Sequence, residues 1–153
     1  MIEQDYFLSR LGMLIFAIVG FFIAKYIYNT KKENKPLVCA VGFDCNGVVN
    51  SRFSKLFGIP VEFFGMLYYA LMSIAYLALL FIPASSLSPL IILFLAFAPM
   101  SAFIFSLYLL FAQVFVLKKG CSWCFISSFV CICIFILTLF VYDISGALQS
   151  FLN

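Results

Sequence analysis

The sequence predicts an all-α fold, a membrane-embedded four-helix bundle in which a cysteine-bearing loop between the first and second spans caps the site. Hydrophobic residues make up 66% of the 153 residues and charged residues only 10%, whereas soluble domains carry about 25% charged residues. Long uncharged stretches alternate with short polar segments along the chain. A chain with so little polar surface is expected to have lipid as its solvent.

A membrane-embedded bundle also limits the possible partners. The net charge is +3, and it comes from lysines in loops, so the chain offers no basic stripe of the kind that binds a phosphate backbone. Nucleic acid is therefore not expected as a partner, whereas the lipid bilayer is.

The first expected span covers about residues 8–28. It holds Lys25 near its end, whose long side chain can carry the ammonium group to the membrane surface. Glu3 and Asp5 precede the apolar run, where a cleaved signal peptide has basic residues, and no small-residue cleavage site follows it. We therefore expect this span to be a permanent helix.

Two further spans are expected in the middle of the chain. No Asp, Glu, Lys or Arg occurs from residue 63 to residue 117. As a single helix this stretch would be about 80 Å long, against a hydrocarbon core of about 30 Å. Pro83 and Pro89 bracket three serines and predict a turn between them. The two spans are therefore expected at about 61–82 and 89–116.

The fourth expected span covers about residues 120–142, an uncharged stretch long enough for one crossing. With an even number of spans, both termini lie on one side of the membrane. The loop at about 29–60 and the short turn at 117–120 then lie together on the other side. We expect residues 1–153 to form one integral membrane domain.

Four of the six cysteines fall on that second side. The segment Cys121–Cys124 is a C-x-x-C motif at the expected start of a helix, where unpaired backbone N–H groups and two preceding lysines lower the pKa of a thiol. Cys39 and Cys45 lie in the loop. Between them, Gly42 and Asp44 allow the chain to fold back until two sulfurs can bond. Two cysteine pairs at the end of an apolar bundle predict exchange between thiols and a lipid-soluble electron acceptor.

Other uses of these cysteines stay open from the residues alone. Four cysteines can bind one zinc ion, but such sites normally pair two short C-x(2–4)-C segments. The loop pair here is more widely spaced and the chain contains no histidine, so we expect no metal site. A purely structural pair of disulfides is another alternative. Cys131 and Cys133 lie deeper in the fourth span and are expected to be small packing residues.

The residues around these cysteines resemble a known family. The run from Cys45 to Pro60 reads CNGVVNSRFSKLFGIP, and Gly65 and the late C-x-x-C motif follow it. This combination resembles the prokaryotic branch of the vitamin K epoxide reductase family, in a single-domain form without a fused thioredoxin-like domain. Thiol oxidases of the DsbB type also have four helices and two cysteine pairs, but they place the C-x-x-C motif in the early loop. The order in this chain is that of the vitamin K epoxide reductase family.

The resemblance implies a role for each of the four cysteines. Cys39 exchanges disulfides with a partner protein, which is expected to be a separate thioredoxin-like protein. Cys45 is the shuttle that attacks Cys121. Cys124, which this attack releases, faces a quinone of the ubiquinone or menaquinone type. The implied enzyme is a membrane thiol:quinone oxidoreductase that supports disulfide bond formation.

Two polar residues near the loop carry further expectations. Ser51 matches the family's loop hydroxyl, which helps to close the site over the quinone, but it is equally expected to cap a short helix through residues 54–57. Glu62, near the start of the second span, can tune a thiol, but we expect it to be an interfacial carboxylate that faces water.

The sequence departs from the animal enzymes at two positions. Their quinone-binding asparagine lies four residues before the glycine that matches Gly65, and here that position is Val61. Their tyrosine lies four residues after Cys124, and here that position is Ser128. Ser128 can reach a quinone oxygen or bond to the helix backbone. These departures favour a quinone reductase over an enzyme that recycles vitamin K.

The resemblance implies a multi-pass protein of the prokaryotic plasma membrane, with the cysteines on the outer side, where disulfides form. The positive-inside rule predicts the opposite orientation, because most basic residues fall on the cysteine side. These basic residues are Lys25, Lys31, Lys32, Lys35, Arg52, Lys55, Lys118 and Lys119. The alternative function is a small membrane carrier or assembly subunit whose cysteines are structural, although the uncharged spans contain few groups for an ion or substrate pathway.

Overall fold

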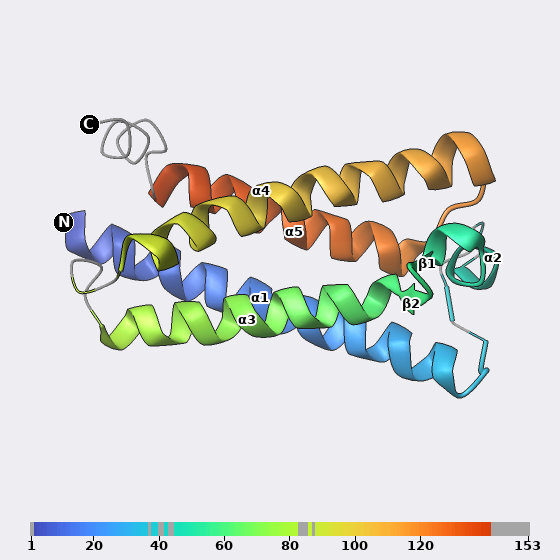
Figure 1. Ribbon diagram of the computed structural model, residues 1–153, viewed down its shortest axis with the longest axis horizontal. Coiled ribbons are helices and arrows are strands. Elements are labelled where there is room, and N and C mark those ends of the chain that lie inside the picture. The colour runs from blue at the N-terminus through green and yellow to red at the C-terminus, as the bar shows by residue number, and fades with distance from the viewer. Residues whose placement is uncertain are drawn as a thin grey trace.

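The computed structural model describes residues 2–36, 38–39, 42, 45–82, 86 and 88–141. Four long helices make up most of this part of the chain: α1 (Ile2–Lys32), α3 (Val61–Phe81), α4 (Pro89–Phe111) and α5 (Ser122–Val141). Each is long and apolar enough to cross a membrane, because its residues are mostly hydrophobic and it holds few charged side chains. The helices lie side by side in an elongated bundle (Figure 1). The predicted all-α fold is confirmed.

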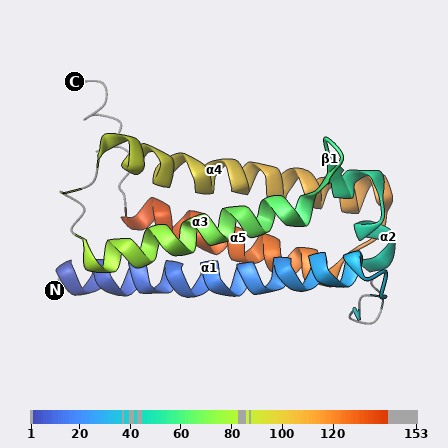
Figure 2. The same ribbon diagram turned by 60° about the horizontal axis from the view of Figure 1, so that its bottom comes forward.

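The four helices do not pack equally on one another. Helix α3 packs along α1, and α5 packs against both α1 and α4, whereas α3 and α4 have few contacts. Figure 2 shows α1 and α4 on opposite sides of the bundle. The interface between α3 and α4 is therefore the loosest side of the bundle.

The tightest packing lies between α1 and α3. Gly20 on α1 is buried, and a Cβ atom at this position would collide with the ring of Tyr69 on α3. The hydroxyl of Tyr69 donates to the backbone carbonyl of Ser127 on α5, with an O···O distance of 3.0 Å. Because glycine lacks a Cβ, α1 can approach α3 and hold this ring in the core. Nearby core side chains are fully buried, among them Met13, Ala17, Met72, Tyr76, Leu95 and Ile134.

Helix α1 continues to Lys32, beyond the end expected at residue 28, because no residue that breaks a helix occurs before Asn34. Asn34 adopts a left-handed conformation, with φ of 56°, and Pro36 follows it. Helix α4 continues into a π-helical segment, η3 (Ala112–Leu117). Lys118 then adopts a left-handed conformation, with φ of 51°, and ends the segment.

A small cap covers one end of the bundle. It consists of the short helix α2 (Cys45–Val49), the 3₁₀ turn η1 (Arg52–Ser54) and a hairpin of β1 (Lys55–Leu56) and β2 (Ile59–Pro60). The hairpin pairs antiparallel, with Leu56 opposite Ile59. The cap lies at the same end as the start of α5, while the start of α1 and the end of α5 lie at the other end (Figure 1). This arrangement agrees with the predicted positions of the loop and the turn.

The hairpin corrects the expectation of a short helix through residues 54–57. Phe57 and Gly58 have φ of 54° and 81°, so both adopt the left-handed conformation of a tight two-residue turn. A right-handed helix cannot pass through two such residues. The chain instead turns back and enters α3 directly after Pro60.

Candidate active site

The first cysteine pair lies in the cap. Cys39 and Cys45 form a disulfide, with their Cα atoms 6.1 Å apart. Cys45 opens α2 and is buried, whereas Cys39 is only half-buried. Of the two cysteines in this disulfide, Cys39 is therefore the one that another protein can reach more readily.

The second pair lies where η3 gives way to α5. Cys121, immediately before α5, is fully buried, and both Cys121 and Cys124 are free thiols. The backbone N–H of Cys124 donates to Sγ of Cys121, with an N···S distance of 3.4 Å. A hydrogen bond from the thiol of Cys124, and the backbone N–H groups of Cys124 and Trp123, hold the pKa of Cys121 below its ordinary value, although burial acts in the opposite direction. The direction agrees with the expectation for a thiol at a helix N-terminus, and its causes are hydrogen bonds from within the motif.

The two residues between Cys121 and Cys124 bring the pairs together. The hydroxyl of Ser122 donates to Sγ of Cys39 over 3.5 Å and lies 3.8 Å from Sγ of Cys45. The indole N–H of Trp123 donates to the backbone carbonyl of Val38 over 2.7 Å. The residues within the C-x-x-C motif thus hold the loop disulfide directly over the start of α5.

The ring of Trp123 also packs against α1. Its centroid lies 4.9 Å from that of the Tyr26 ring. Trp123 therefore joins α1, α5 and the segment that leads to Cys39. This packing fixes the loop disulfide relative to two of the four long helices.

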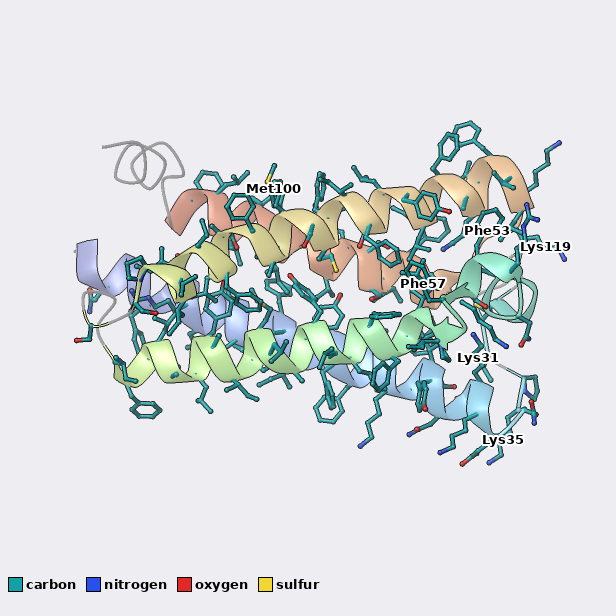
Figure 3. The ribbon with its side chains drawn as sticks, in the orientation of Figure 1. Lys31, Lys35, Phe53, Phe57, Met100 and Lys119 are labelled. Carbon is teal, nitrogen blue, oxygen red and sulfur yellow. A yellow bond between two sulfur atoms is a disulfide. The ribbon has the colours of Figure 1, made fainter. Side chains whose placement is uncertain are left out.

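A buried ion pair lies beneath the cap and corrects the expectation for Glu62. Nζ of Lys31 lies 3.4 Å from Oε2 of Glu62, and the two side chains are only 12% and 10% exposed. The same ammonium group donates to Oγ of Ser54 over 3.1 Å. Figure 3 shows Lys31 at the capped end of the bundle. Glu62 does not face water, because α1 extends far enough to bring a lysine to it.

Ser51 lies in the turn between α2 and η1. Its hydroxyl donates to the backbone carbonyl of Val48 over 2.7 Å, and it makes no side-chain cap bond to η1. It does not line the cavity described below. In this structure, Ser51 stabilises the turn that follows α2.

A cavity of about 560 Å³ lies below the C-x-x-C motif, with walls mainly from α3, α4 and α5 and smaller contributions from α1, β1 and η3. Most of its lining is apolar or aromatic. Its polar and sulfur-bearing lining residues include Glu62, Tyr68, Gln113, Cys124, Ser128 and Cys131. Cys124 thus joins the cysteine pairs to an apolar space whose size suits a small ring compound.

Ser128 lines this cavity one helical turn beyond Cys124. The residue is buried. Cys131 lines the cavity one turn further, with Sγ 2.9 Å from the hydroxyl of Tyr69. Cys131 is therefore part of the cavity wall as well as a packing residue. Cys133 does not line the cavity.

Two cavity residues were not identified from the sequence as candidate ligands. Within the described part of the chain, the hydroxyl of Tyr68 and the side-chain oxygen of Gln113 are buried and have no hydrogen-bond partner. Gln113 is the single amide side chain between residues 63 and 117, and a lone amide in so long an apolar stretch is the sequence signal that marks it. Two unsatisfied polar atoms in an apolar cavity suit a ring compound that carries oxygen atoms.

Comparison with known proteins gives one finding that bears on this site. Residues 11–139 match the model of the vitamin K epoxide reductase family. That range includes both cysteine pairs and every cavity residue named above. No curated protein matches the chain.

Within the described residues, no three or more cysteine or carboxylate side chains gather as metal ligands.

Proposed function

The chain belongs to the vitamin K epoxide reductase family, and from this premise we propose that it passes electrons from a separate thioredoxin-like protein through its two cysteine pairs to a quinone. Family membership makes the protein an oxidoreductase with redox-active cysteines, and the four apolar helices make it an integral multi-pass membrane protein. The observation that carries the proposal is the position of Cys124, which belongs to a C-x-x-C motif and also lines an apolar cavity.

The first step is disulfide exchange with the partner. A partner thiolate attacks Sγ of Cys39, and Cys45 leaves as a thiolate. The second partner thiol then displaces Cys39, so the partner leaves with a disulfide and the loop pair becomes two thiols. The greater exposure of Cys39 supports this order of attack.

The second step moves the electrons inward. The Cys45 thiolate attacks Sγ of Cys121 in the oxidised C-x-x-C motif, and Cys124 leaves as a thiolate. Cys39 then closes the loop disulfide with Cys45 and releases Cys121. The contacts of Ser122 with both loop sulfurs support this route, and so does the lowered pKa of Cys121, which makes it a good leaving group.

The last step takes place at the cavity. A bound quinone accepts two electrons and two protons, and the disulfide between Cys121 and Cys124 forms again. The apolar walls exclude water from Cys124, and the sparse contact between α3 and α4 provides a route from the lipid. Val61 and Ser128 stand where the animal enzymes have their quinone-binding asparagine and tyrosine. This supports a ubiquinone or menaquinone as acceptor in place of a vitamin K epoxide.

The test is anaerobic mixing of the reduced, desalted protein with a ubiquinone or menaquinone analogue, while quinone absorbance and thiol content are followed together. We expect one quinone reduced for each pair of thiols lost, and no reaction in Cys124→Ala. Cys133→Ala is the matched control, because Cys133 is on the same helix but away from the cavity. A folded, reduced wild type that reacts with neither quinone would favour the carrier or assembly subunit with structural cysteines.

We also place the cysteine end on the outer side of a prokaryotic plasma membrane, where disulfides form. Lys35 lies at this end with its side chain 69% exposed, so a Lys35→Cys variant offers a reactive site outside both pairs. An impermeant maleimide added to intact cells is expected to label this variant above the wild-type level. Labelling only after lysis would put the cysteines in the cytoplasm, as the distribution of lysines predicts.

A further inference from the structure

Gln113 is a deeply buried amide in the wall of the cavity. The residue is 4% exposed, and its side-chain oxygen has no hydrogen-bond partner among the described residues. A buried acceptor without a partner destabilises a folded chain, because it loses its water and gains nothing in return. A ligand that donates a hydrogen bond to the side-chain oxygen of Gln113 would remove this cost.

The backbone around Gln113 is unusual as well. Gln113 lies in η3, where the hydrogen bonds skip one more residue than in an α-helix. Its carbonyl accepts the backbone N–H of Lys118 and that of Lys119, the latter over 3.1 Å. The wider turn changes the direction of the side chains on this stretch. Such π turns are frequent at functional sites, and this one lies beside the C-x-x-C motif.

Tyr68 is a second unsatisfied group in the same cavity. It comes from α3 and lines the same cavity as Gln113, and its buried hydroxyl also has no partner in the described part of the chain. A hydroxyl and an amide are neutral, so they can remain at membrane depth without the penalty of a charge. Both can donate to the carbonyl oxygens of an oxidised ring and accept from the hydroxyl groups of a reduced one.

We propose that Gln113 and Tyr68 bind the ring oxygens of the quinone, and so supply polar contacts that the apolar side chain at Val61 cannot supply. This inference rests on the proposed function. It makes the two residues ligands for the oxygen atoms specifically, so their contribution depends on those atoms and not on the shape of the ring. A ring of the same shape without oxygen atoms gains nothing from them.

The test compares two ligands on the full chain in detergent. One is 2,3-dimethyl-1,4-naphthoquinone, and the other is 2,3-dimethylnaphthalene, which has the same ring and no oxygen atoms. Gln113→Met keeps the length of the side chain and removes its donors and acceptor. We expect this variant to bind the quinone about tenfold more weakly, which corresponds to about 1.4 kcal/mol. Binding of the hydrocarbon is expected to stay unchanged.

Two further variants complete the test. Tyr68→Phe is expected to weaken quinone binding by a similar factor. Ser73→Ala on the same helix is the control. The hydroxyl of Ser73 donates to the backbone carbonyl of Tyr69, and Ser73 does not line the cavity. Without ligand, the melting temperature of Gln113→Met is expected to equal or exceed that of the wild type, because the buried side-chain oxygen has no partner to lose.

The possible outcomes separate the inference from the function. Equal losses for the quinone and the hydrocarbon would mean that Gln113 and Tyr68 only shape the cavity, and would overturn the inference. Unchanged quinone binding in both variants would overturn it as well, while quinone reduction by the wild type would leave the proposed function standing. A wild type that neither binds nor reduces the quinone would overturn both.

Discussion

Helix α3 has two interfaces that differ in almost every respect. Toward α1 it is closed, and Gly20 lets the ring of Tyr69 pack directly against the facing helix. Toward α4 it is open, and both helices line a cavity of about 560 Å³. Tyr68 and Tyr69 are adjacent in sequence, yet Tyr69 donates to Ser127 and Tyr68 has an unpaired hydroxyl.

The difference shows how one helix can serve stability and reaction at once. The closed interface removes apolar surface from the lipid and positions α3 relative to α1 and α5. The open interface keeps volume that a well-packed core would fill. An added side chain should therefore reduce stability at the closed interface and reduce activity at the open one.

The largest effect is expected from filling the open interface. Ala98 and Ala102 lie one turn apart on α4 and both line the cavity. The double variant Ala98→Phe/Ala102→Phe puts two rings into this space, and we expect quinone reduction to fall by about 100-fold because the acceptor can no longer approach Cys124. Initial rates with a quinone analogue measure the loss.

The melting temperature of this double variant is expected to stay close to that of the wild type, because the new rings enter existing space. Leu107→Phe is the matched control, since Leu107 lies on the outer side of α4, 45% exposed, and does not line the cavity. A normal rate in the double variant would mean that the open interface is not the route to Cys124.

The next effect is expected at the closed interface. Gly20→Ala forces a methyl group against the ring of Tyr69, and we expect the free energy of unfolding to fall by about 1–3 kcal/mol. Gly12→Ala on the same helix is the control, because its Cβ would lie at an ordinary 3.9 Å from Leu137. Chemical denaturation in detergent compares the two. An equal effect of both substitutions would remove the distinction between the interfaces.

The sequence predicts the closed part of the bundle well, because uncharged length and proline position are sufficient to identify spans. The helices, their order and the meeting of the cysteine pairs at one end follow from these simple features. The first helix nevertheless runs to Lys32, and this length decides the surroundings of Glu62. Lys31 reaches that carboxylate only because the helix does not stop at residue 28.

The open part is harder to predict, because its features depend on tertiary contacts and not on local preference. A π turn carries Gln113 toward the cavity, and no hydrophobic pattern distinguishes such a turn from an α-helix. Phe57 is a poor residue for a left-handed conformation, so the sequence favours a short helix where the structure has a hairpin. Such departures from local preference are expected near functional sites.

A smaller effect is expected above the open interface, where the cysteine pairs meet. Ser122→Ala removes the hydroxyl that contacts Cys39 and Cys45. We expect exchange between the pairs to slow by about tenfold, since a hydrogen bond to a developing thiolate is lost. Trp123, the single tryptophan of the chain, donates to Val38 beside the loop pair, so its fluorescence can follow the exchange when a dithiol is added to oxidised protein.

Ser122→Thr, which keeps the hydroxyl, is expected to restore most of the exchange rate. The first turnover of fully reduced protein with quinone should be unchanged in Ser122→Ala, because oxidation of Cys121 and Cys124 does not need the loop pair. Equal slowing of both reactions would show that Ser122 supports the local fold and has no specific effect on exchange.

The smallest effect concerns the pKa of Cys121. The thiol of Cys124 provides the main hydrogen bond that lowers it, so Cys124→Ala is expected to raise the pKa of Cys121 toward its ordinary value, while Cys124→Ser keeps a donor. Ultraviolet thiolate absorbance, taken as the difference from the same protein with Cys121→Ser, measures this titration. An unchanged pKa in Cys124→Ala would assign the shift to the backbone N–H groups of α5 alone.

The same shift links the redox pair to stability. A lowered pKa in the folded chain means that the unfolded chain holds more protons between the two pKa values, so stability rises with pH across that window. The contribution is present above the unfolded pKa and is lost as the pH falls through the folded one. In Cys124→Ala this rise should flatten. Cys124, which lines the cavity, would then also be the group that lowers the pKa of its buried neighbour Cys121.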